Sequence, residues 1–196
     1  LDNGFSKADL LNLVRGIREV NQTVPIVFYV YFNQIFSQGV EAYMQEFLDA
    51  GVDGLLTLDL PPVEANEYLV TCEKVGMKSV FIIAPTTPES RIKEIANSST
   101  GFIYYVSREG VTGVRDSLNA DLSEKVRIIK GNTDKPVVVG FGISKQSQVR
   151  EVAEVADGVV VGSAIVNVIA DHLDDKEAML SGLKNFVKEL SEGVLS

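Results

Sequence analysis

One recurring pair of segments constrains the fold of this chain more than any other feature. A short apolar run, rich in β-branched and aromatic residues, is followed by a turn and an amphipathic stretch with helical spacing. The apolar runs are continuous rather than alternating, which is typical of strands covered on both faces. The pattern therefore predicts an α/β fold in which each strand is followed by a helix. The six predicted strands are residues 25–31, 53–59, 79–84, 101–107, 136–142 and 157–162.

The segments between these runs carry start and stop signals for helices. Gly51 and Gly76 end two of them as C-cap glycines do, Pro88 and Glu89 open a third, and Ser144 is the predicted N-cap of a fourth. A further helix, capped by Ser6, precedes the first strand, although a βα array normally begins with a strand. The predicted helices span residues 6–20, 39–51, 63–76, 88–99 and 144–156.

Periodicity alone does not separate an open doubly wound sheet from a β/α barrel. No G-x-G-x-x-G or G-x-x-x-x-G-K-[ST] fingerprint follows the first strand. Glycine and hydroxyl clusters instead follow the last three strands, at 109–113, 140–144 and 162–166. The last cluster opens a short helix, as at the anion site of phosphate-binding barrels, where the N–H groups of Gly162 and Ser163 would face a phosphate. The simpler alternative is that these glycines only serve tight turns.

Composition excludes several classes of function. The 196 residues include one cysteine, Cys72, and one histidine, His172. These cannot form a disulfide, a structural metal site, or a Cys-His or Ser-His-Asp set. We expect Cys72 in the core, His172 at a helix end and the chain in the cytoplasm. The net charge of -9 argues against nucleic-acid binding, and no apolar run is long enough to span a membrane.

Five segments together carry a family resemblance over essentially the whole chain. They are DLPPVEA (59–65), APTTPESRI (84–92), YYVSREGVTG (104–113), PVVVGFGIS (136–144) and DGVVVGSAIV (157–166). In order and spacing the chain resembles the α subunit of tryptophan synthase. The resemblance implies a single-domain (β/α)8 TIM barrel of the phosphate-binding type over residues 1–196. It also implies cleavage of indole-3-glycerol phosphate to indole and glyceraldehyde 3-phosphate, a carbon-carbon lyase reaction of tryptophan biosynthesis.

The resemblance also implies a partner and a set of site residues. Indole would pass to a β subunit that carries pyridoxal phosphate, whereas no cofactor or metal is expected in this subunit. Gly113, Gly142, Gly162 and Ser163 match positions that hold the substrate phosphate. Thr112 matches a threonine that positions a catalytic aspartate, Tyr104 a tyrosine beside the catalytic glutamate, and Tyr31 a tyrosine near the substrate glycerol. Leu58, Ile83 and Phe141 match positions around the indole ring, and Asn33, Asp59 and Pro61 match the interface with the β subunit. Barrel packing alone would also account for the apolar positions.

The two catalytic carboxylates that the resemblance implies have no counterpart here. In the family, the glutamate lies on the first barrel strand and the aspartate follows the second, in a PFSDP-type segment that this sequence lacks. We therefore assign no catalytic residue and expect the chain to correspond to strands three to eight of the barrel, binding the substrate without turnover on its own.

Two other functions remain open. The chain could be a non-catalytic, phosphate-binding module that regulates the β subunit, in which case it would change that subunit's activity and release no indole. It could also be another phosphate-binding barrel enzyme, such as a sugar-phosphate isomerase or a prenyl-glyceryl transferase. Binding of indolepropanol phosphate would separate the tryptophan synthase α reaction from the reaction of another phosphate-binding barrel enzyme.

Overall fold

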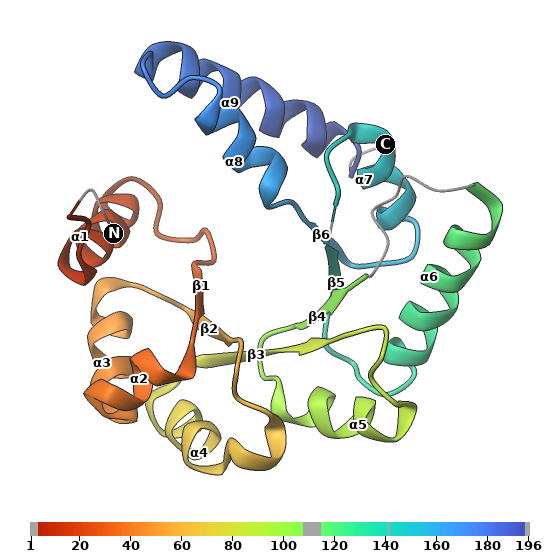
Figure 1. Ribbon diagram of the computed structural model, residues 1–196. Coiled ribbons are helices and arrows are strands. Elements are labelled where there is room, and N and C mark those ends of the chain that lie inside the picture. Colours follow the sequence, from red (N-terminus) through yellow and green to blue (C-terminus); the bar gives the residue numbers. More distant parts are fainter. Residues whose placement is uncertain (1–3, 108–114, 141, 195–196) are drawn as a thin grey trace. The chain divides into compact units, whose positions relative to one another are not determined.

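The computed structural model describes residues 4–107, 115–140 and 142–194, with the backbone alone over 115–120. Strands and helices alternate along the chain (Figure 1), and the chain divides into two compact units. The first comprises Leu1–Phe81 and Asn97–Gly101, and the second comprises Ile82–Ala96 and Phe102–Ser196. Over the described residues the strands follow the six predicted apolar runs, so the α/β prediction is confirmed.

The first unit holds a parallel arrangement of strands in the order β1, β2, β3. Tyr29 of β1 pairs in register with Leu56 of β2, which in turn pairs with Val80 of β3. The elements of this part of the chain are α1 (Lys7–Val20), β1 (Val27–Val30), α2 (Phe32–Gln38), α3 (Val40–Ala50), β2 (Gly54–Thr57), the 3-10 helix η1 (Pro62–Glu64), α4 (Asn66–Val75) and β3 (Lys78–Ile83).

The second unit repeats this arrangement with strands in the order β4, β5, β6, again parallel. Val106 of β4 pairs in register with Gly140 of β5, which pairs with Val160 of β6. The remaining elements of the chain are α5 (Glu89–Ser98), β4 (Ile103–Val106), α6 (Arg115–Lys130), β5 (Val137–Gly140), α7 (Gln146–Ala153), β6 (Gly158–Val160), α8 (Ser163–Ala170) and α9 (Lys176–Glu192).

Alternation along the strands separates a helix-covered face from a more accessible one. In the first unit, Phe28 contacts Phe47 of α3 edge to face at 5.1 Å between ring centroids, while its neighbour Tyr29 is 63% exposed. In the second unit, Ile103 and Tyr105 are buried, while Tyr104 between them is half-buried. When a strand buries every second side chain against helices, the side chains between them remain accessible and can line a binding site.

Several predicted helix ends are confirmed at atomic detail. The Ser6 hydroxyl accepts a hydrogen bond from the Asp9 N–H at 3.2 Å, and the Asp9 carboxylate accepts one from the Ser6 N–H at 2.9 Å, which forms a capping box. Gly51 and Gly76 adopt φ angles of 105° and 83°, as left-handed C-caps do. Helix α1 precedes β1, as the sequence predicted.

Ser144 is not the cap of α7, contrary to the sequence prediction. The helix begins at Gln146 after the N-cap residue Lys145, and no side chain caps it from that position. The Gln148 side chain takes this role instead, because its Oε1 accepts from the N–H groups of Ser144 at 2.8 Å and Lys145 at 3.1 Å.

Two other boundaries also differ from the predictions. Helix α4 begins at Asn66, since the two prolines before it lead into η1, and α5 begins one residue after Pro88.

Two aspartates tie the starts of neighbouring strands together. Asp53, before β2, accepts from the N–H of Ile26 at 2.7 Å and from Arg18 of α1 at 2.6 Å. Asp157, before β6, likewise accepts from the N–H of Val137 at 2.8 Å and from Lys130 of α6 at 2.8 Å. Each carboxylate therefore bridges one strand to the next and to the helix that precedes the earlier strand.

Candidate functional site

The carboxyl ends of β5 and β6 bring two predicted phosphate ligands to the same edge of the second unit. Gly140 and Val160 are paired in register, and Gly142 and Gly162 each follow two residues later. In parallel sheets the carboxyl ends of neighbouring strands lie at one edge, where α/β proteins place their ligands. The structure thus brings together two turns that lie 20 residues apart in sequence.

The turn after β5 presents backbone N–H groups. Gly142 has a φ angle of 69°, a left-handed conformation that side chains disfavour, and it is exposed. Among the described residues, no acceptor is recorded for the N–H groups of Gly142 and Ile143, whereas those of Ser144 and Lys145 bind Gln148. The turn can therefore donate two hydrogen bonds to an anion.

The turn after β6 leads directly into α8. Gly162 is the N-cap residue, and its carbonyl accepts from the N–H groups of Ile165 at 2.9 Å and Val166 at 3.3 Å. Ser163 is exposed at the first helical position. The first N–H groups of a helix have no partner within the helix, and the helix dipole favours an anion beside them. The hydroxyl of Ser163 and the adjoining N–H groups thus form a second set of donors.

Tyr104 lies over Gly140 on the accessible face of the second unit. A Cβ atom built on Gly140 would be 2.6 Å from the Tyr104 Oη and 2.8 Å from the Cβ of Val160. The phenol therefore reaches across β5 only because position 140 has no side chain. Tyr104 is half-buried, which leaves its ring accessible to a ligand at this edge.

The first unit holds the predicted interface residues and two substrate candidates. The carboxylate of Asp59, after β2, accepts from the N–H of Phe32, the first residue of α2. This bond joins the segment after β1, which carries Tyr31 (56% exposed) and the exposed Asn33, to the segment after β2. That second segment carries the half-buried Leu58 and Pro61.

Ile83 has no accessible surface, whereas its neighbour Ile82 is half-buried. Ile83 alternates with Phe81, whose ring meets that of Tyr68 of α4 at 6.3 Å, so both face the helices. Ile82 is thus a candidate that the sequence analysis missed. The run SVFIIA predicts a strand, but which of its residues face the helices is set by the packing of Phe81 against Tyr68.

Thr112, Gly113 and Phe141, three further predicted site residues, lie outside the described residues. Cys72 is 1% exposed, and its Sγ lies 3.9 Å from the Sδ of Met44, as expected of a core residue. Burial raises the pKa of its thiol to about 11. His172 follows α8, and its Nδ1 lies 2.9 Å from the carbonyl oxygen of Val168, at the predicted helix end.

The described residues contain neither a cluster of metal-ligating side chains nor a membrane-spanning helix. Within residues 4–107, 115–140 and 142–194, no three histidine, cysteine or acidic side chains gather as metal ligands would. Over the same part of the chain, no helix has the length and apolar character needed to cross a membrane.

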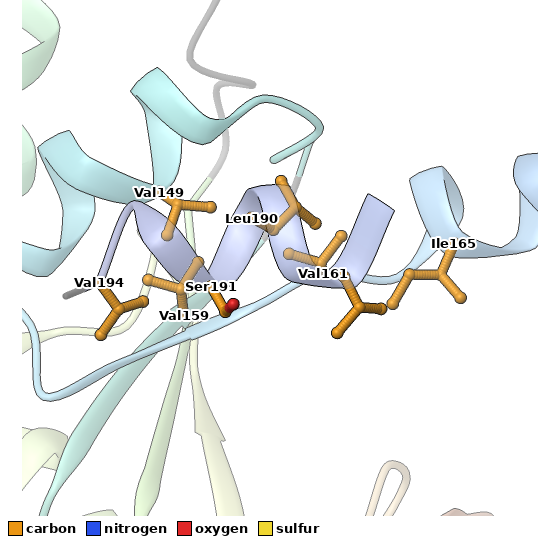
Figure 2. A pocket seen from close by; sticks show the side chains of 8 residues that line it. Val149, Val159, Val161, Ile165, Leu190, Ser191 and Val194 are labelled. Atoms are coloured by element: carbon orange, nitrogen blue, oxygen red, sulfur yellow. The ribbon is translucent and has the colours of Figure 1, made fainter. Parts of the chain in front are cut away.

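An apolar pocket of about 310 Å³ lies elsewhere in the second unit, between β6, α7, α8 and α9 (Figure 2). It contains Val159 of β6, which alternates with Val160 and so belongs to the helix-covered face of the strand. The pocket therefore lies on the helix-covered face of β6, next to the turn that carries Gly162. It is lined by Val149, Val159, Val161, Ile165, Val187, Leu190, Ser191 and Val194.

Parallel strands joined by helices, with glycine-bearing turns after two neighbouring strands, are typical of α/β proteins of the phosphate-binding TIM-barrel class. Within that class, residues 1–195 match the family model described as "Tryptophan synthase alpha chain". The chain belongs to this family, and its function is that of a carbon-carbon lyase in tryptophan biosynthesis.

Relatives support this assignment over nearly the full chain. The tryptophan synthase alpha chain of Opitutus terrae is 53% identical over 193 residues, which cover 98% of this chain and 72% of that relative. The alpha chain of Geobacter sp. (strain M21) is 44% identical, with 100% and 72% covered. A chain from a structure of the "tryptophan synthase a2b2 complex" of Pyrococcus furiosus superposes with a TM-score of 0.87 at 38% identity, covering 97% of this chain and 76% of that one.

Proposed function

We propose that this chain binds indole-3-glycerol phosphate at the carboxyl edge of its strands for retro-aldol cleavage to indole and glyceraldehyde 3-phosphate. The observation that carries the proposal is that two turns with hydrogen-bond donors lie next to each other. One contains Gly142, and the other contains Gly162 and Ser163. Each glycine follows by two residues a strand position that is in register with the other strand. Two converging sets of N–H donors suit a phosphate ester.

The phosphate would be held by neutral donors. The N–H groups of Gly142 and Ile143 donate from one turn, and Ser163 at the start of α8 donates from the other. Gly113 and Thr112 belong to the same proposal by family resemblance. Hydrogen bonds to a charged acceptor contribute about 1.5–3 kcal/mol each, so a few such donors suffice for specific binding.

The indole ring and the glycerol would contact the accessible faces of the strands. Leu58, Ile82 and Phe141 are proposed for the apolar ring, with Ile82 taking the place first given to Ile83 because Ile83 is buried. Tyr31 and Tyr104 would approach the glycerol and the reacting carbon. Flat apolar walls with a few polar groups are typical of such sites.

The chemistry needs proton transfers that these residues do not supply. Cleavage of the C3–C3' bond requires a proton at C3 of the indole and loss of a proton from the glycerol hydroxyl, a task for positioned carboxylates. None of the 27 acidic residues matches the family's glutamate or aspartate segment. We therefore propose that the 196 residues alone bind the substrate without cleaving it.

A β subunit is the proposed partner, and it would carry the pyridoxal phosphate. Asn33, Asp59 and Pro61 are the proposed contacts, supported by the exposure of Asn33 and by the bond that ties the two loops together. The alpha chain of Pyrococcus furiosus comes from an a2b2 complex. We further propose a cytoplasmic location, one domain over residues 1–196 and no cofactor in this subunit.

Titration with indolepropanol phosphate, followed by calorimetry, tests the binding proposal. Micromolar to millimolar binding that Ser163→Asp abolishes would support it, because a carboxylate at the helix start repels the phosphate. Binding of sugar phosphates in its place would favour another phosphate-binding barrel enzyme.

An indole assay separates the remaining functions. Indole-3-glycerol phosphate is mixed with this chain, with a β subunit, and with both. Indole released by this chain alone would contradict the proposed inactivity. A change in β-subunit turnover on addition of this chain, without binding of indolepropanol phosphate in the calorimetric titration, would instead favour the regulatory module.

A further inference from the structure

We infer that Gln148 is a positioning residue for the phosphate-binding turn after β5. The inference rests on the proposed function, because it concerns the turn that would hold the substrate phosphate. Gln148 is buried, so it would act without touching the ligand. It acts through the backbone of Ser144 and Lys145, the last residues of the turn, and so determines which N–H groups of the turn remain available.

Gln148 is a polar residue that lies buried in the protein interior. The residue is only 5% exposed, although an amide prefers water unless its hydrogen bonds are satisfied. Oε1 accepts from the Ser144 N–H at 2.8 Å, the Lys145 N–H at 3.1 Å and the Ser144 hydroxyl at 3.4 Å. A buried amide that accepts from one short segment holds that segment in one conformation.

The turn is fixed at both of its ends. At its start, Gly142 is held with a φ angle of 69°, and Ile143 next to it is buried with 3% exposure. At its end, the two N–H groups bound by Gln148 are turned toward the protein. The N–H groups of Gly142 and Ile143 are left without a recorded acceptor in the described part of the chain. Gln148 thus divides the four donors of the turn into two that are satisfied internally and two that can face a ligand.

An ordinary helix cap explains only part of this arrangement. A residue at the third helical position often accepts from the N-cap N–H, which here is that of Lys145. Gln148 also holds Ser144, one residue earlier and outside the helix, at a shorter distance. Capping alone predicts a loss of stability when the amide is removed. Positioning predicts, in addition, a loss of ligand affinity in the protein that remains folded.

The test uses Gln148→Met, which keeps the length of the side chain but removes the acceptor, with Gln146→Met as its matched control. Gln146 lies in the first turn of the same helix, and no hydrogen bond of its side chain is recorded among the described residues. The affinity for indolepropanol phosphate is measured by calorimetry at a temperature where both variants are folded. We expect about a tenfold rise in Kd for Gln148→Met, which is 1.4 kcal/mol, and less than a twofold change for Gln146→Met.

Amide hydrogen exchange of the unsubstituted chain gives a second readout that does not depend on a variant folding. The Ser144 and Lys145 amides should be protected without ligand, and the Gly142 and Ile143 amides should become protected when the ligand is added. Equal Kd values for Gln148→Met and the parent chain, or unprotected Ser144 and Lys145 amides, would overturn the role of Gln148 while leaving the phosphate site intact. If the parent chain binds no ligand, the proposed function fails and this inference fails with it.

Discussion

Gly140 shows how a single missing side chain shapes the candidate site. Its Cα lies beneath the Tyr104 phenol and beside Val160. A Cβ at this position would approach the Tyr104 Oη to 2.6 Å and the Val160 Cβ to 2.8 Å. Carbon atoms in contact are usually 3.5–4.0 Å apart, so one of the neighbours would have to move.

Gly140→Ala should therefore lower the free energy of unfolding by about 1–3 kcal/mol, the usual range for overpacking. Gly16→Ala is the matched control, because a Cβ at Gly16 meets nothing within 4 Å in the middle of α1. The control should be neutral or more stable by up to about 1 kcal/mol. Urea denaturation of both variants measures the difference, and equal stabilities would refute the steric argument.

Cys72 should be unreactive in the folded chain. Burial raises the pKa of its thiol to about 11, and the side chain is 1% exposed. At pH 8 roughly one thiol in a thousand would then be the reactive thiolate, before access is considered. A chromogenic disulfide reagent should label the native chain slowly and the urea-unfolded chain at once. Rapid labelling of the native chain would show that α4 opens readily.

At the scale of elements, the aspartates that precede β2 and β6 connect neighbouring strands through hydrogen bonds. Asp157 accepts from the Val137 N–H and from Lys130, and removing it leaves that N–H without its partner. Asp157→Ala should lower the free energy of unfolding by about 1–2 kcal/mol. Asp134→Ala, at an exposed carboxylate nearby in sequence, should change it by less than about 0.5 kcal/mol. A decrease in the free energy of unfolding no larger than that of the control would mean that water replaces the hydrogen bonds of Asp157.

The stability that Asp157 contributes should depend on pH in a defined direction. Burial alone would raise the pKa of Asp157, but the hydrogen bonds from Lys130 and the Val137 N–H outweigh it, and the net shift is downward. The stability it contributes is therefore complete above the unfolded pKa of about 3.9 and is lost as pH falls through the lower, folded pKa. The stability difference between the parent chain and Asp157→Ala should shrink across that interval, and a difference that stays constant would contradict the linkage.

Local sequence signals predicted most of the elements but missed those whose cause is distant in sequence. Ser6, Gly51 and Gly76 marked helix ends correctly because their capping partners lie within a few residues. Helix α2 was not predicted, since the carboxylate at its start comes from Asp59, 27 residues later. The error at Ser144 has a similar cause: a hydroxyl is the usual cap, but the turn is held from inside the helix by Gln148.

The candidate site was only partly predictable for a related reason. Glycine clusters pointed to Gly142 and Gly162 because the turns themselves need glycine or precede a helix. Which of two adjacent isoleucines is accessible depends on the phase of the strand, which is fixed by packing of Phe81 against Tyr68. That phase is a tertiary property and is not encoded in the run SVFIIA alone.

At the scale of the whole molecule, the second unit carries a series of exposed apolar side chains along α9. Leu173, Leu180, Val187 and Val194 recur every seven residues along and beside α9, and each is between 48% and 74% exposed. Val187 and Val194 also line the apolar pocket in Figure 2. Exposed apolar surface binds small hydrophobic dyes.

We therefore expect the folded chain to enhance the fluorescence of anilinonaphthalene sulfonate. Val187→Glu should reduce the enhancement by at least about half, because it places a charge at the rim of the pocket. Val70→Glu, at a 58% exposed valine on α4, serves as the control and should leave the signal unchanged. An equal reduction by both variants would mean that the dye does not select this surface.

The amide of Gln148 has one more consequence, which concerns titration. Gly142, Gly162, Ser163 and Gln148 carry no group that gains or loses a proton between pH 5 and pH 9. A turn held by a neutral amide keeps its shape over that range, so the affinity for a phosphate ester should follow the ionisation of the ester alone. Binding should strengthen as pH rises through the second phosphate pKa near 6 and then level off. A bell-shaped profile in calorimetric titrations would reveal an ionisable protein group at the site.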